Sequence, residues 1–123
     1  MPNQQRTLDR VFRALSDPTR RAVLRRLSAG GAPVSELAAP FEMALPSFLQ
    51  HLRLLEECGL VRSRKRGRVR TYALTPRGLS SAEDWLSQQR SRWVRRLDQL
   101  DQTLGEIALA ESSTKQKPPK EKP

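Results

Sequence analysis

Residues 44–74 decide the fold, and their sequence is ALPSFLQHLRLLEECGLVRSRKRGRVRTYAL. The first half places leucine or phenylalanine at helical spacing and ends at a glycine, which predicts an amphipathic helix over 44–58. The second half alternates apolar and basic residues around Gly67-Arg68, which predicts two strands, 60–66 and 69–74, joined as a hairpin. Because such a hairpin is only marginally stable alone in water, it must pack against helices.

The helix predicted over 44–58 has two different sides when its residues are placed at helical angles. The apolar side, expected to pack on a core, consists of Leu45, Phe48, Leu52 and Leu55. The opposite side carries Pro46, Ser47, Gln50, Arg53 and Glu57. Leu49 and His51 lie at the two borders. One side therefore fixes the helix, and the other is left for a partner.

Three further helices are predicted before residue 44. The first covers 7–15, where the apolar residues on one face are Leu8, Val11, Phe12 and Leu15. The second is expected to begin at Pro18, with Asp17 as its N-cap, and to end near Ala29 before two glycines. The third is short and lies near 35–39. The third and fourth helices then form a helix–turn–helix.

A long final helix is predicted after the hairpin. Thr75-Pro76 repeats the pattern of a cap followed by proline, so we expect the helix to begin there and to end around Ala110. Residues 111–123 contain lysine, proline and serine without apolar residues that could anchor them, which predicts a disordered basic tail. The predicted fold is mainly α with a small β-hairpin (α+β), in one domain over 1–110.

The final helix carries an apolar stripe with heptad spacing, interrupted at Arg90. Its members are Leu86, Trp93, Leu97, Leu100, Leu104 and Ile107. A domain of this size cannot bury such a stripe by itself, so we expect a homodimer in which two copies of the helix pack together. Leu8, Val11 or Phe12 of the first helix is expected to contribute to the same interface.

Charge indicates the class of partner. The chain has 123 residues, a formal net charge of +10 and an isoelectric point of about 11.2, which favours a polyanion. No apolar run is long enough to span a membrane, and the polar N-terminus gives no sign of export. One cysteine, Cys58, fits a reducing cytoplasm. We therefore expect a cytoplasmic protein that binds double-stranded DNA.

The helix–turn–helix and the hairpin supply the predicted DNA contacts. In this motif the second helix enters the major groove, where Gln50 suits adenine and Arg53 suits guanine or a phosphate. The basic hairpin is expected to meet phosphates or to probe the minor groove. The predicted DNA-binding residues are Pro46, Ser47, Leu49, Gln50, His51, Arg53, Arg64, Lys65, Arg66, Arg68 and Arg70.

Several segments resemble the ArsR/SmtB-type winged-helix repressors. The resemblance lies in Arg13-Ala14-Leu15-Ser16-Asp17-Pro18-Thr19-Arg20, in Val34-Ser35-Glu36-Leu37-Ala38, in Gln50-His51-Leu52-Arg53-Leu54-Leu55-Glu56-Glu57-Cys58-Gly59-Leu60-Val61, and in Gly67-Arg68 followed by Tyr72-Ala73-Leu74. It covers roughly residues 8–110. It implies a homodimeric winged helix that binds an inverted-repeat operator and represses transcription, with the hairpin as the wing.

The chain departs from the metal-sensing members of the family that it resembles. Those members often carry a cysteine pair in the third helix, where this chain has Leu37-Ala38-Ala39, or ligands that include histidine on the last helix, which has none here. We therefore predict no metal site and no cofactor. Whether a small-molecule effector acts on the protein is left open.

Other interpretations remain open at this stage. A single histidine, a single cysteine and no glycine-rich phosphate loop favour a protein that is not an enzyme. The alternatives to a specific repressor are a winged-helix adaptor for other proteins and a non-specific DNA-binding protein. Cys58 is either a redox sensor or, as we expect, a small packed residue, and His51 is either a phosphate contact or a structural residue.

Overall fold

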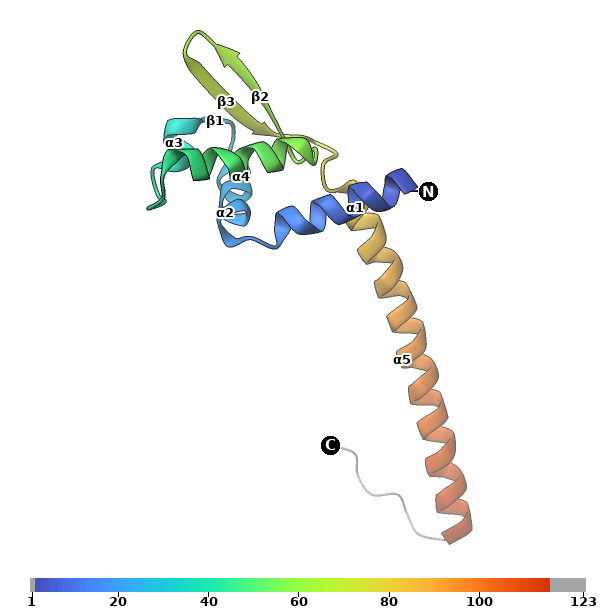
Figure 1. The fold of residues 1–123 in the computed structure, drawn as a ribbon. Helices are drawn as coiled ribbons and strands as arrows, with labels where there is room; N and C mark the ends of the chain where they lie inside the picture. Colours follow the sequence, from blue (N-terminus) through green and yellow to red (C-terminus); the bar gives the residue numbers. More distant parts are fainter. Residues whose placement is uncertain (1, 116–123) are drawn as a thin grey trace. The chain divides into compact units, whose positions relative to one another are not determined.

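The computed structural model describes residues 2–115, which form five helices and three strands (Figure 1). The elements are α1 (Pro2–Leu15), α2 (Pro18–Leu27), β1 (Ala32–Pro33), α3 (Val34–Ala38), α4 (Leu45–Glu57), β2 (Val61–Arg66), β3 (Val69–Leu74) and α5 (Ser80–Lys115). The chain divides into two compact units, Met1–Asp84 and Trp85–Pro123. The predicted class, mainly α with a small β-sheet and a long last helix, is confirmed.

The sheet has three antiparallel strands in the order β1-β3-β2. The predicted hairpin is confirmed: β2 and β3 pair from Val61 opposite Leu74 to Arg66 opposite Val69, and Gly67 turns the chain with a φ of 61°. The pair extends away from the helices in Figure 1. The short β1 was not predicted, because two residues carry no alternation that a sequence pattern could show.

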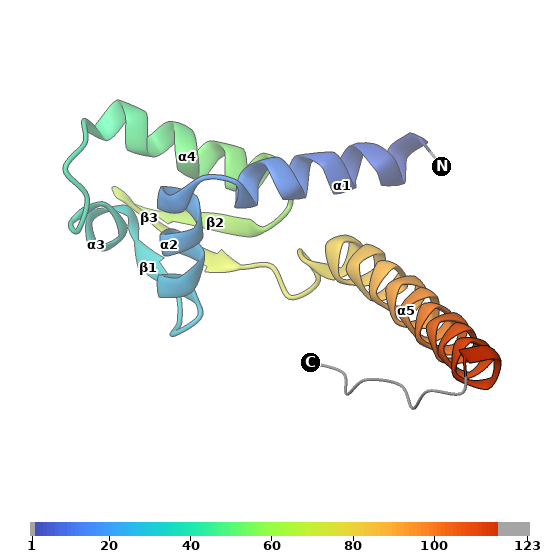
Figure 2. The same ribbon diagram turned by 90° about the horizontal axis from the view of Figure 1, so that it is seen from below.

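The core of the first unit lies between helices α1–α4 and the base of the sheet (Figure 2). α4 contributes Phe48, Leu52 and Leu55, and each of the three is completely buried. Burying one such side chain stabilises a fold by roughly 1.5–3 kcal/mol. Leu45 was expected on the same side but is 52% exposed, because it occupies the first position of α4, where the helix has only begun to pack.

The start of α2 has the predicted cap. The Asp17 carboxylate accepts a hydrogen bond of 3.0 Å from the backbone N–H of Arg20, and Pro18 is the first helical residue. Burial tends to raise the pKa of Asp17, but the hydrogen bond from the backbone N–H of Arg20 and the surrounding positive charge outweigh it, so the pKa lies below its ordinary value. The cap therefore holds a carboxylate in its charged form.

The predicted limits of the first and last helices were wrong. α1 begins at Pro2 instead of Thr7. α5 begins at Ser80, not at Thr75-Pro76, because the Thr75 N–H extends the sheet by donating to the Leu60 carbonyl at 3.0 Å. The chain then makes a turn closed by a 3.0 Å hydrogen bond from the Gly78 N–H to the Thr75 carbonyl. Proline after threonine here opens a turn rather than a helix.

α5 also extends further than predicted. It reaches Lys115, so residues 111–115 are helical rather than part of a disordered tail. The rest of that predicted tail, 116–123, lies outside the described residues. No helix in the described part of the chain is long and apolar enough to cross a membrane.

Candidate nucleic-acid interface

α4 presents the polar side that the sequence predicted. Pro46, Ser47, Gln50 and Arg53 are exposed, while the opposite side of the helix is completely buried at Phe48 and Leu52. Leu49 and His51 are half-buried at the borders, as predicted. α3 ends at Ala38, and the connection to Leu45 completes the helix–turn–helix. The exposed side of α4 is therefore held in place by its own packing and is available to a groove of DNA.

Arg20 joins three helices behind this surface. Its Nε donates to the Ala14 carbonyl at 2.9 Å and its Nη2 to the Arg13 carbonyl at 3.0 Å, both at the end of α1. Its Nη1 lies 3.0 Å from Nδ1 of His51 on α4. Arginine can satisfy all of these because its guanidinium carries five donors in one plane. The contacts connect the end of α1 to the middle of α4 and help set the orientation of α4.

This contact decides which nitrogen of His51 carries the proton. Arginine has no acceptor, so Nδ1 must accept from Arg20, and Nε2 then carries the hydrogen. A competing contact, 3.8 Å from the same Nδ1 to the Asp17 carboxylate, is longer and requires a protonated ring. Only the contact with Arg20 is within hydrogen-bond distance, so it sets the role of Nδ1. His51 is thus structural through Nδ1 and keeps an Nε2–H donor.

The wing, β2 with β3, has two faces of different character. One face carries Arg62, Arg64 and Arg66, which line a half-open hollow of about 580 Å³ together with Ser63, Thr71 and Ala73. The other face is buried at its base by Val61 and Tyr72 and carries Lys65 and Arg70 further out. The sequence placed Arg64, Lys65, Arg66 and Arg70 in one group, whereas the register separates them. Arg62, which is not among the predicted DNA-binding residues, lies on the same face as Arg64 and Arg66. Its position two residues before Arg64 in the strand could have indicated this.

A chain of hydrogen bonds ties the wing to α4. Arg70 Nη1 donates to the Ser63 hydroxyl at 2.7 Å, and that hydroxyl donates to the Glu56 carboxylate at 2.9 Å. Burial and the nearby Glu56 charge raise the pKa of Tyr72, so its hydroxyl beside Ser63 stays neutral. Arg70 therefore connects the wing to the end of α4, in addition to any role with DNA.

The wing carries positive charge that the protein itself does not neutralise. Lys65 and Arg70 lie directly opposite each other across the two strands, an arrangement of like charges that destabilises a sheet. Among residues 5–112, no basic side chain of the wing lies in an ion pair. Such a surface suits a polyanion that supplies the missing negative charge.

The basic residues of α2 have mixed roles. Arg20 and Arg21 bond to carbonyls at the end of α1, with Arg21 Nη1 2.7 Å from the Leu15 carbonyl oxygen. Arg26 pairs with Glu36 at 3.0 Å. Several arginines of α2 therefore already have partners within the protein.

Cys58, at the end of α4, is a partly buried free thiol. Burial raises the pKa of the Cys58 thiol, whose Sγ donates to the Leu55 carbonyl at 3.4 Å. A raised pKa lowers the fraction of reactive thiolate, which favours the packed-residue interpretation. Within the described part of the chain there is no group of three or more histidine, cysteine or acidic residues that could hold a metal ion. The prediction of no metal site remains a prediction.

The apolar stripe of α5 is exposed on the second unit. Its members are between 48% and 65% exposed: Leu86, Trp93, Leu97, Leu100, Leu104 and Ile107. Of the three α1 residues named for the same interface, Val11 was wrong, because it is completely buried in the core of its own chain. Leu8 and Phe12 are only partly buried against that core and keep some accessible surface.

The chain matches a helix–turn–helix domain family over residues 15–64. The HTH-type transcriptional regulator Rv2034 of Mycobacterium tuberculosis is 42% identical over 76 residues, covering 62% of this chain and 71% of that protein. The transcriptional repressor SdpR of Bacillus subtilis is 30% identical over 79 residues, covering 64% of this chain and 88% of that protein.

Solved structures agree with the sequence relatives. The crystal structure of an ArsR family transcriptional regulator has a TM-score of 0.68 at 52% identity, covering 76% of this chain and 93% of that one. An ArsR-like transcriptional regulator from Rhodococcus sp. RHA1 has a TM-score of 0.69 at 33% identity, covering 82% and 95% of the two chains. With the exposed polar side of α4 and the basic wing beside it, these likenesses establish that the chain belongs to the ArsR family of DNA-binding transcriptional regulators.

Proposed function

We propose that the protein is a homodimeric repressor that binds an inverted-repeat operator, with α4 in the major groove and the wing on the flanking DNA. The observation that carries the proposal is the contrast within α4, whose one side is completely buried while the other exposes Ser47, Gln50 and Arg53. A helix fixed in this way can place hydrogen-bonding groups at set positions along base edges. The name of the repressor SdpR, a relative, supports repression as the outcome.

Different residues of α4 are expected to contact different groups of the DNA. Gln50 suits the paired donor and acceptor of adenine, and Arg53 suits the two acceptors of guanine. Pro46 and Ser47, in the first turn of α4, would meet the edge of the groove, and the half-buried Leu49 would contact a thymine methyl group. The Nε2–H of His51, left over from its contact with Arg20, suits a phosphate oxygen.

The wing supplies affinity rather than sequence preference. Its basic residues that are free of ion pairs face two directions, with Arg64 and Arg66 on one face and Lys65 on the other, and Arg68 follows Gly67 in the turn. A hairpin tip with charge on both faces can lie between two phosphate strands or enter the minor groove. Each phosphate contact releases counterions, so binding must weaken steeply with salt.

Fluorescence anisotropy on the full chain tests the proposal. A duplex from upstream of the protein's own gene is compared with a shuffled duplex across a salt series. We expect preference for the native duplex and an affinity that falls steeply as salt rises. Equal binding to both duplexes would favour a non-specific DNA-binding protein, and no binding at low salt would favour the adaptor.

Two variants distinguish recognition of bases from binding of phosphates. Arg53→Ala is expected to lower affinity for the native duplex by roughly 1–3 kcal/mol and to leave the shuffled duplex nearly unaffected. Arg66→Ala is expected to weaken binding to both duplexes alike and to reduce the salt dependence by about one phosphate contact. If both variants lose equally on both duplexes, this division of roles is wrong.

A further inference from the structure

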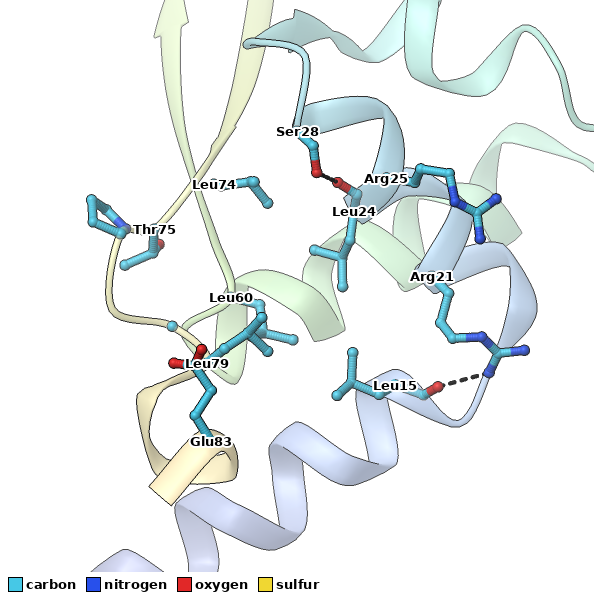
Figure 3. A pocket seen from close by; sticks show the side chains of 12 residues that line it. Leu15, Arg21, Leu24, Arg25, Ser28, Leu60, Leu74, Thr75, Leu79 and Glu83 are labelled. Carbon is cyan, nitrogen blue, oxygen red and sulfur yellow. Dashed lines mark hydrogen bonds between the residues drawn. The ribbon is translucent and has the colours of Figure 1, made fainter. Parts of the chain in front are cut away.

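A second candidate site lies in the first unit, away from the exposed side of α4. It is a half-open pocket of about 550 Å³, formed by the end of α1, by α2, by the end of β3 and by the segment 75–83 (Figure 3). Pockets that bind small molecules have volumes of about 300–1,000 Å³, so this one is of suitable size. None of the predicted DNA-binding residues lines it.

The interior of the pocket is apolar. Five leucine side chains lie around the open space (Figure 3), contributed by α1, by α2, by the residue before β2, by the end of β3 and by segment 75–83: Leu15, Leu24, Leu60, Leu74 and Leu79. Leu60 is buried, whereas Leu79 is 44% exposed. The Ser28 hydroxyl at the border already donates to the Leu24 carbonyl at 3.1 Å. An apolar group that filled the space would remove leucine surface from water without breaking a hydrogen bond.

The rim of the pocket is charged and asymmetric. Arg21 and Arg25 of α2 lie on one side, and Glu83 lies on the opposite side (Figure 3). Arg21 already donates to the Leu15 carbonyl. Arg25 is exposed, and its side chain makes no hydrogen bond or ion pair with any residue among 5–112. The rim therefore offers one uncommitted guanidinium, and its two positive charges outweigh the single negative charge.

We propose that this pocket binds an amphipathic organic carboxylate, with its hydrocarbon part among the leucines and its carboxylate on Arg25. The planar guanidinium matches a carboxylate through two parallel hydrogen bonds, which a neutral or cationic head group cannot form. The site does not depend on the proposed DNA contacts. Segment 75–79, which lines the pocket, connects β3 of the wing to α5, so an occupant would contact that connection.

Titration calorimetry on the full chain, with octanoate, octan-1-ol and octylamine as probes, tests the charge preference. The three share one hydrocarbon chain and differ only in head group. We expect octanoate to bind with an affinity about five- to tenfold above that of the alcohol and further above that of the amine, because a charge-assisted hydrogen bond is roughly twice as strong as a neutral one. Absence of saturable octanoate binding, or equal binding of acid and alcohol, would overturn the proposal.

Variants place the binding in the pocket. Arg25→Gln should remove the advantage of octanoate over octan-1-ol, while Arg26→Gln, a change in a neighbour that pairs with Glu36 outside the pocket, should leave it intact. Leu79→Trp should fill the space and weaken all three probes, and because Leu79 is 44% exposed the fold should tolerate the change. Circular dichroism checks each variant for folding.

Methyl NMR gives the location independently of the variants. On addition of octanoate, the leucine methyl signals of Leu24 and Leu79 should move, and those of Leu97 and Leu104 on α5 should not. Movement of the α5 signals alone would show that octanoate only coats the exposed apolar stripe, and the proposal would then be wrong.

Discussion

Arg20 shows how one side chain can serve both stability and the presentation of α4. Its guanidinium holds two carbonyls at the end of α1 and Nδ1 of His51, with all three contacts between 2.9 and 3.0 Å. Lysine could not replace it, because a single ammonium cannot reach in three directions within one plane. Arg20 can therefore influence the orientation of α4 without touching DNA itself.

Arg20→Ala is expected to lower the free energy of unfolding by about 2–3 kcal/mol, because it leaves carbonyls of α1 and a ring nitrogen of α4 without their donor. Urea denaturation followed by circular dichroism measures the loss. Arg26→Ala is the matched control: it breaks an exposed ion pair with Glu36 and should cost less than about 1 kcal/mol. A loss for Arg20→Ala no larger than for the control would show that the three contacts do not stabilise the fold.

Asp17 gives the stability a dependence on pH. Its pKa in the folded protein lies below the ordinary 3.8, so its contribution is complete above that value and is lost as the pH falls through the lower folded pKa. Asp17→Ser keeps an N-cap acceptor without an ionisable group. We expect the stability difference between wild type and Asp17→Ser to shrink between pH 6 and about pH 2.5, in urea titrations at each pH. A difference that is constant over this range would contradict the assignment.

At the scale of elements, sequence patterns correctly predicted the helices and strands whose formation depends on neighbouring residues. The alternation on both sides of Gly67 indicated the hairpin, and the spacing from Phe48 to Leu55 indicated the buried side of α4. Thr75-Pro76 misled, because the Thr75 N–H finds a partner in Leu60, far away in sequence. Gly78 shows the same effect: a Cβ there would lie 2.7 Å from the Gly59 carbonyl oxygen, so the turn packs directly against the start of β2.

The candidate site was predicted in composition but not in geometry. The sequence named the exposed residues of α4 and the basic residues of the wing, and the former are exposed as expected. It could not show that Arg70 is tied through Ser63 to Glu56, because that link depends on the register of two strands and on their packing against a helix. Nor could it show that Val11 faces its own core, since an apolar helix face has the same pattern whichever surface covers it.

Lys65 can test whether the like charges of the wing, which destabilise the sheet, serve DNA binding. Lys65→Glu would replace a repulsive pair with an attractive one opposite Arg70. We expect the free energy of unfolding to rise by roughly 0.2–1 kcal/mol and the affinity for any duplex to fall, the latter measured by anisotropy. Lys65→Gln should show a smaller change of the same sign in both measurements. A charge reversal that weakened DNA binding without stabilising the fold would contradict the proposed conflict.

At the scale of the whole molecule, the question is what covers the stripe on α5. Six large apolar side chains, each at least 48% exposed, repeat along one side of α5. Stable interfaces bury about 1,200–2,000 Å² in total, and two such helices packed side by side would offer apolar surface of the required kind. A two-fold dimer would also present two copies of α4 to DNA, at half-sites about 34 Å apart.

Leu97→Glu should therefore convert the protein to a monomer in light scattering coupled to size exclusion, because it places charge in the centre of the stripe. Gln99→Glu adds the same charge on the opposite side of α5, beside Arg92, Arg95 and Arg96, and should leave the dimer intact. On DNA, the Leu97→Glu monomer should lose affinity for an operator with two half-sites by at least about tenfold, since the second contact is no longer linked to the first. Its affinity for a single half-site should hardly change, because α4 and the wing are complete within one chain. A Leu97→Glu protein that remained dimeric would mean that α5 does not form the interface, and a wild-type monomer would mean that the stripe serves a different partner.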